Sequence, residues 1–110
     1  MLVNSQDLDY EVGTYGGGLV RLDPDGEVER RFRFDPGDDR SLNDDRILAL
    51  GEDRNGTLWV GTFGGGLNRF DGEDGFTHFR HRPDDPRSLA SDQVTSICED
   101  HEGTLWVGTD

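Results

Sequence analysis

The chain has 110 residues, of which 31% are hydrophobic and 32% charged, and its formal net charge at pH 7 is −13. So large an acidic excess makes nucleic acid and anionic membrane surfaces unfavourable partners. No apolar run approaches the roughly 20 residues of a membrane span, the first ten residues lack the basic and apolar regions of a signal peptide, and the single Cys98 leaves no disulfide within the chain.

The sequence repeats itself with a period of 47 or 48 residues. VGTYGGGL begins at Val12, VGTFGGGL at Val60 and VGT at Val107. A period of about 40–50 residues is typical of solenoids, propellers and arrays, in which each unit buries its apolar faces against its neighbours. The sequence therefore predicts similar units in a row.

The first unit, residues 1–45, is interpreted as the second, third and fourth strands of a repeat, followed by a crossing to the next unit. EVGTY at 11–15 is the first clear match to the repeat. Glu11 stands where the later copies have a tryptophan, so the first copy begins irregularly.

The second unit, residues 46–91, is predicted to be complete. Short runs rich in apolar or β-branched residues at 45–52, 57–62, 67–71 and 76–82 predict four strands. The polar segment that follows is predicted to cross to the third unit, residues 92–110, which contains the first and second strands only.

Tight turns separate these predicted strands. Asp at the start of a turn and Gly at its end occur in DRNG, with Asp53 and Gly56, and in DHEG, with Asp100 and Gly103. Three consecutive glycines, Gly64, Gly65 and Gly66, turn the chain after the second strand. Trp59 and Trp106 follow the Asp turns at the same position of the repeat, and both are expected to be buried between sheets.

Four antiparallel strands per period of about 47 residues predict an all-β fold of β-propeller blades, about two and a quarter of them. The ordered combination of LWVGT, GGGL, RSL and ED..G over residues 12–109 resembles the two-component regulator propeller repeat of bacterial hybrid histidine kinases. The resemblance implies a piece of a larger propeller that is periplasmic or extracytoplasmic and senses a ligand. It also implies signal transduction through an output module outside this chain.

The same resemblance implies no catalysis by the chain itself, and no cofactor is expected. No metal site is expected either, because His78 and His81 lie three apart on a predicted strand, hence on opposite faces, and His101 lies in a turn one blade away. A structural or oligomerising propeller scaffold remains an alternative, as does a propeller lyase or glycosidase, although no blade offers a His and Glu pair near the channel. Further blades of the parent chain are the expected partners. Unpaired strands at both ends also predict self-association.

Candidate ligand-binding residues follow from blade topology. In a propeller, the crossing between blades and the turn between the second and third strands open on one face. This rule selects eight residues: Tyr15, Phe63, Arg40, Ser41, Asp45, Arg87, Ser88 and Asp92. An aromatic ring beside carboxylate, guanidinium and hydroxyl groups is suited to stack on and hydrogen-bond a carbohydrate or another small ligand. The alternative, that the rings pack between blades and the arginines pair with Asp, remains open.

Overall fold

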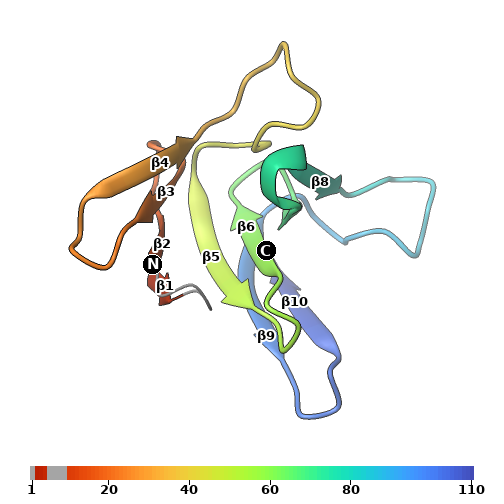
Figure 1. Ribbon diagram of the computed structural model, residues 1–110. Helices are drawn as coiled ribbons and strands as arrows, with labels where there is room; N and C mark the ends of the chain where they lie inside the picture. Colours follow the sequence, from red (N-terminus) through yellow and green to blue (C-terminus); the bar gives the residue numbers. More distant parts are fainter. Residues whose placement is uncertain (1, 5–9) are drawn as a thin grey trace.

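The computed structural model describes residues 2–4 and 10–110, and its strands form three antiparallel sheets (Figure 1). The first contains β1 (Leu2–Asn4), β2 (Tyr10–Gly13), β3 (Leu19–Leu22) and β4 (Val28–Phe32); the second contains β5 (Ile47–Glu52), β6 (Leu58–Thr62), β7 (Leu67–Phe70) and β8 (Phe76–Phe79). The third contains β9 (Val94–Glu99) and β10 (Leu105–Thr109), and a 3₁₀ turn, η1 (Gly72–Asp74), precedes β8. The predicted all-β, blade-like architecture is confirmed.

The first sheet has one strand more than the sequence analysis expects. The backbone of β1 pairs antiparallel with β2, with Leu2 opposite Val12 and Asn4 opposite Tyr10. A three-residue strand is too short to produce a recognisable alternation of apolar and polar residues, so pattern reasoning does not detect it. The expectation that β2 lacks an inner partner is therefore wrong.

Glycines bring neighbouring sheets into close contact. A Cβ atom on Gly61 of β6 would lie 2.6 Å from Cγ1 of Val94, which begins β9. One repeat earlier, a Cβ atom on Gly13 of β2 would lie 2.5 Å from Cγ2 of Ile47, which begins β5. The glycine of each of the first two VGT sequences is thus the point at which the first strand of the next blade docks.

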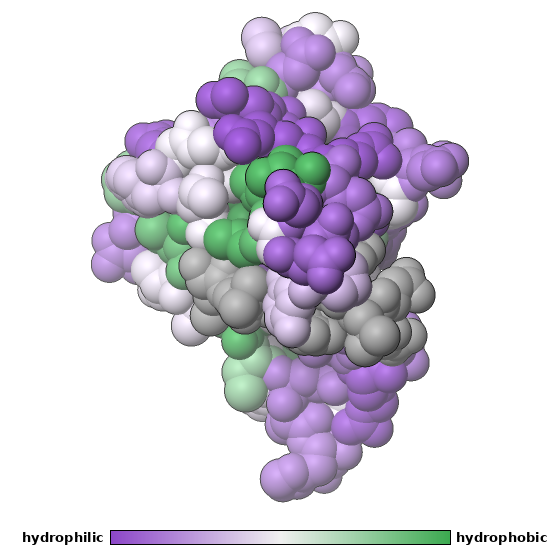
Figure 2. Space-filling model, turned by 60° about the vertical axis from the view of Figure 1, so that its left-hand side comes forward, coloured by the Kyte–Doolittle hydropathy of each residue, from purple (hydrophilic) through white to green (hydrophobic). Residues whose placement is uncertain are grey.

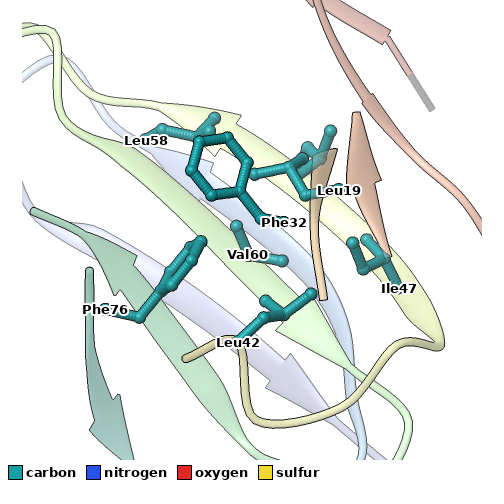
Figure 3. Packing of buried hydrophobic residues seen from close by; sticks show 8 residues of the cluster. Leu19, Phe32, Leu42, Ile47, Leu58, Val60 and Phe76 are labelled. Atoms are coloured by element: carbon teal, nitrogen blue, oxygen red, sulfur yellow. The ribbon is translucent and has the colours of Figure 1, made fainter. Parts of the chain in front are cut away.

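The seam between the first and second sheets, called seam one here, holds the main apolar core. Side chains from both sheets and from the crossing point toward one another in this seam (Figure 3): Leu19, Phe32, Leu42, Ile47, Leu50, Leu58, Val60 and Phe76. The face seen in Figure 2 is mostly hydrophilic, with hydrophobic residues gathered toward the middle of the view. The main apolar core therefore lies where two blades pack together.

The two tryptophans share a hydrogen bond but not an environment. The indole Nε1 of Trp59 donates to Asp53 and that of Trp106 to Asp100, at 3.1 and 2.9 Å. Trp59 is half-buried beside the ring of Phe79 in β8, whereas Trp106 is 62% exposed. The expectation that both are buried is wrong for Trp106, because the described part of the third sheet has no counterpart of β8 to cover it.

Candidate ligand-binding face

Hydrogen bonds hold the glycine loops between the second and third strands. In the second sheet, the hydroxyl of Thr62 donates to the carbonyl of Gly66 at 2.9 Å and accepts from the N–H of Gly65 at 2.8 Å. Gly66 has a φ of 75°, in the left-handed region that favours glycine. The N–H of Gly66 also donates to the carbonyl of Asp92 in the next crossing, at 2.9 Å. Each glycine loop is thereby fixed to the crossing that follows it.

These loops bring two predicted aromatic residues together. The rings of Tyr15 and Phe63 meet edge to face, with centroids 6.1 Å apart, although they are 48 positions apart in the sequence. Tyr15 is 64% exposed and Phe63 is 36% exposed. The two rings thus pack against each other between the first and second blades, as the alternative expects, while part of each ring stays accessible from solvent.

A charged pair that the sequence analysis does not select lies beside the rings. The guanidinium of Arg46 sits 4.5 Å from the centroid of Phe63 and forms two hydrogen bonds with the carboxylate of Asp44, at 3.0 and 3.1 Å. The N–H of Gly64 donates to the same carboxylate at 2.8 Å. This geometry fixes the guanidinium against the face of the Phe63 ring, a cation–π arrangement.

Both members of this pair are charged at neutral pH. Burial raises the pKa of the Asp44 carboxyl, but hydrogen bonds from the Arg46 side chain and from the backbone N–H groups of Arg46 and Gly64 outweigh it and hold the pKa below the usual 3.8. The hydrogen bond that Arg46 donates to Asp44 raises the pKa of the Arg46 guanidinium in turn. The pair is thus a permanent polar feature of this face.

A hollow of about 470 Å³ opens between the first and second sheets at this face. It is lined by Phe34, by the polar residues Asn43, Asp44, Asp45 and Arg46, and by the loop glycines Gly16 and Gly64. Phe34 is 46% exposed and lines the hollow. Tyr15 and Phe63 adjoin it: their chain neighbours Gly16 and Gly64 are part of its lining, and the lining residue Arg46 contacts the Phe63 ring. We refer to the hollow and the adjoining pair of rings as the aromatic hollow.

Sequence reasoning missed Phe34 because it lies in a crossing, where the repeat is least regular. Its counterpart 47 residues later is His81. The only available signal was that departure from the repeat, an aromatic residue in place of a polar one in an otherwise hydrophilic crossing.

The predicted serine and aspartate side chains accept hydrogen bonds from backbone N–H groups of the crossings. The hydroxyl of Ser41 accepts from the N–H of Asp35 at 2.9 Å, and that of Ser88 accepts from the N–H of Arg82 at 2.8 Å. The Asp45 carboxylate accepts from the N–H of Phe34 at 2.6 Å; Asp92 binds the N–H of His81 in the same way at 2.7 Å. The backbone carbonyls of Asp45 and Asp92 accept hydrogen bonds from the glycine loops, so both residues lie next to these loops. A ligand role for the two serines and the two aspartates remains a prediction.

The two predicted arginines lie away from the aromatic rings. Arg40 reaches the turn between β7 and β8, where its guanidinium donates to the carboxylate of Asp71 at 3.2 Å and to the carbonyl of Asp74. The side chain of Arg87, its counterpart one repeat later, is 92% exposed, with the carboxylate of Asp85 3.8 Å away. The structure therefore does not bring Arg40 or Arg87 together with Tyr15 and Phe63.

Within residues 2–4 and 10–110, the His, Cys, Asp and Glu side chains do not gather into any group of three or more suited to a metal ion. In the same part of the chain, no helix has the length and apolar character needed to cross a bilayer.

Residues 41–64 and 88–110 match the two component regulator propeller family. Each segment begins at the serine of a crossing, Ser41 or Ser88, and ends one or two residues after the next VGT sequence, so the repeat identified from the sequence is confirmed. No curated protein matches the chain.

Solved structures from Bacteroides thetaiotaomicron share the fold. The extracellular domain of one protein assigned as a hybrid two component system superposes with a TM-score of 0.82 at 20% identity, covering 96% of this chain and 15% of that one. A second extracellular domain with the same assignment gives 0.57 at 22% identity, covering 98% and 20%. A structural genomics protein of unknown function gives 0.70 at 18% identity, covering 98% and 32%. The chain thus corresponds to a small part of each, and at these identities the likeness shows the fold.

Proposed function

We propose that this chain, which carries two-component regulator propeller repeats, is a ligand-sensing segment of the propeller of a bacterial two-component system. We propose further that the segment is extracytoplasmic and not catalytic in itself. The similarity to extracellular domains assigned to hybrid two component systems supports the location and the signalling role. The aromatic hollow supports the sensing role.

The observation that carries this proposal is the pair of exposed rings, Tyr15 and Phe63, beside a hollow lined by Phe34. Exposed aromatic rings are costly to leave in water and stack well on the apolar C–H faces of sugars. The ion pair of Asp44 and Arg46 places fixed hydrogen-bonding groups beside them. A hollow of about 470 Å³ is also within the size range of ligand sites.

We propose a neutral saccharide as the ligand class. The net charge of −13 repels anionic glycans at low salt. Arg46, the cation at the hollow, is already neutralised by Asp44, so it offers little attraction to an added carboxylate or sulfate. Neutral hydroxyl groups, in contrast, can accept from the guanidinium and donate to the carboxylate without a charge penalty.

Isothermal titration of the 110-residue chain against a panel of neutral hexasaccharides tests the proposal. At least one is expected to bind, and Tyr15→Ala and Phe63→Ala are each expected to weaken it about 5–50-fold, the equivalent of about 1–2.3 kcal/mol of lost stacking. Val28→Ala, which shortens an exposed apolar side chain on β4 away from the hollow, is the matched control and should leave affinity unchanged. Equal affinity in all three variants would contradict the proposed site.

A further inference from the structure

We infer that the saccharide proposed for the aromatic hollow extends past Phe34 into a second hollow of the first crossing, so that the site takes an oligosaccharide of several sugar rings. The inference rests on the proposed function and adds to it the length of the ligand and the residue that selects for length. The first crossing is the loop between β4 and β5 in Figure 1, residues 33–46, and Phe34 lies near its start.

The second hollow, called the crossing hollow here, has a volume of about 400 Å³. Phe34 and Asn43 line both this hollow and the aromatic hollow, so the two hollows adjoin at these residues. The rest of its lining comes from the first crossing and from His78 of β8. Each hollow alone reaches the size range of sites for drug-sized ligands. A single sugar ring, which is smaller than such ligands, would therefore leave one of the two hollows empty.

Phe34 places an exposed aromatic ring where the second crossing has a polar side chain. Its counterpart His81 binds the carbonyl of Leu89 through ring Nδ1 at 2.7 Å and so ties the second crossing to itself. Phe34 has no polar side-chain atom to bind the equivalent carbonyl, that of Leu42. Among the described residues its ring also makes no contact with another aromatic ring and no cation–π contact. The ring is thus available to stack on a sugar.

Hydrogen bonds hold the backbone at the junction of the two hollows. The N–H of Phe34 donates to the carboxylate of Asp45 at 2.6 Å, and the N–H of Asn43 donates to Oδ1 of the buried Asn68 at 2.9 Å. The Nδ2 group of Asn43 donates to the carbonyl of Gly65 at 3.0 Å, which leaves the side-chain oxygen of Asn43 to accept from a ligand hydroxyl. The junction therefore offers an apolar ring and a hydrogen-bond acceptor on a preorganised backbone.

The polar groups of the crossing hollow favour an uncharged ligand. Asp35 and Asp38 each accept a backbone N–H within the crossing through Oδ1, from Gly37 and Arg40 respectively, both at 2.9 Å. Their second carboxylate oxygens, with the carboxylate of the exposed Asp39, can accept from sugar hydroxyls. A carboxylate or sulfate on the ligand would face these three carboxylates and no guanidinium among the described lining residues. The part of the oligosaccharide that enters the crossing hollow is therefore neutral.

Isothermal titration with a length series tests the inference. The tightest-binding hexasaccharide of the panel is compared with the tetrasaccharide and the disaccharide of the same series, each titrated into the 110-residue chain. The hexasaccharide is expected to bind about tenfold more tightly than the disaccharide, because it adds stacking on Phe34 and hydrogen bonds in the crossing hollow. In the ¹⁵N-labelled chain, the amides of Gly37 and Asp39 should shift with the hexasaccharide and not with the disaccharide.

Phe34→Ala removes the ring and keeps the backbone hydrogen bond to Asp45. It is expected to weaken the hexasaccharide about 3–10-fold, the loss of one stacking contact, and to leave the disaccharide unchanged. Phe34→Tyr keeps a ring at this position and should retain the affinity for both. Val28→Ala, an exposed position on β4 outside the lining of both hollows, is the matched control and should change neither.

Equal affinity for the disaccharide and the hexasaccharide would overturn the inference and leave the proposed function standing. So would an equal loss of affinity for both ligands in Phe34→Ala. Binding of no saccharide of any length would contradict the proposed function and the inference together.

Discussion

The indole of Trp59 donates a hydrogen bond of 3.1 Å to the carboxylate of Asp53, six residues earlier in the same hairpin. The other oxygen of that carboxylate accepts from the N–H groups of Asn55 and Thr57, at 2.9 and 3.0 Å. One carboxylate thus closes the turn and positions the tryptophan, which lines the groove between the second and third sheets. Asp100 and Trp106 repeat the arrangement at 2.9 Å.

Replacing Asp53 by alanine removes three hydrogen bonds and is expected to lower the free energy of unfolding by about 1–3 kcal/mol. Urea denaturation followed by tryptophan fluorescence measures the change. Asp39→Ala, at an exposed position of the first crossing, is the control and should stay within about 0.5 kcal/mol of the parent chain. Equal effects of the two substitutions would show that the turn carboxylate does not stabilise the blade.

Acid is expected to destabilise the chain. Five carboxyls among the described residues have a lowered pKa: Asp44, Asp53, Asp71, Asp92 and Asp100. At Asp71 the first cause is the hydrogen bond from the Thr77 hydroxyl. At Asp53 burial raises the pKa, and the hydrogen bonds from Trp59 and the turn amides outweigh it. A lowered folded-state pKa gives stability that is present above the unfolded value of 3.8 and is lost as the pH falls through the folded value.

Glu52 acts in the opposite direction. Burial, and then the charge of Asp53, raise its pKa from 4.5, so its contribution is present below that value and is lost as the pH rises through the folded pKa. With five groups against one, the melting temperature should be nearly constant from about pH 7 to 5 and fall below about pH 4. Calorimetry across this range is the measurement, and a melting temperature that rises between pH 4 and 3 would contradict the assignment.

Gly61→Ala is expected to separate the second and third sheets. The added methyl group would lie 2.6 Å from Cγ1 of Val94, a fully buried residue, and 3.2 Å from its carbonyl oxygen. Overpacking of this kind costs about 1–3 kcal/mol, which a urea titration resolves. Gly37→Ala, in an exposed crossing where the new atom meets only the carboxylate of Asp35 at 3.4 Å, serves as the comparison and should change stability little.

Ser41→Ala distinguishes a structural role in the crossing from a ligand role. Its hydroxyl accepts from the N–H of Asp35 and donates to the Asp35 carbonyl, at 2.9 and 3.1 Å. Its loss should cost about 1 kcal/mol of stability and leave saccharide affinity unchanged. A loss of affinity comparable to that of Phe63→Ala, without a loss of stability, would instead assign Ser41 to the ligand.

The repeat made the four strands of the second blade predictable, because Asp53, Gly56 and the glycines at 64–66 punctuate apolar runs by known turn chemistry. It also selected Tyr15 and Phe63, which the fold brings together. It did not reveal Phe34 or the pair of Asp44 and Arg46, because these contacts form only when a crossing from one blade folds over the glycine loop of the next. The exposure of Trp106 was likewise invisible, since burial depends on which strands surround a residue.

Chemical-shift mapping of the ¹⁵N-labelled chain decides whether the aromatic hollow binds a neutral saccharide. With the tightest-binding hexasaccharide of the panel, we expect saturable shifts at Gly16, Gly64 and the Arg46 side chain, and none at Leu105 or Val107, which line the groove between the second and third sheets. Shifts confined to that groove, or no shift with any saccharide of the panel, would rule out a saccharide site in the aromatic hollow.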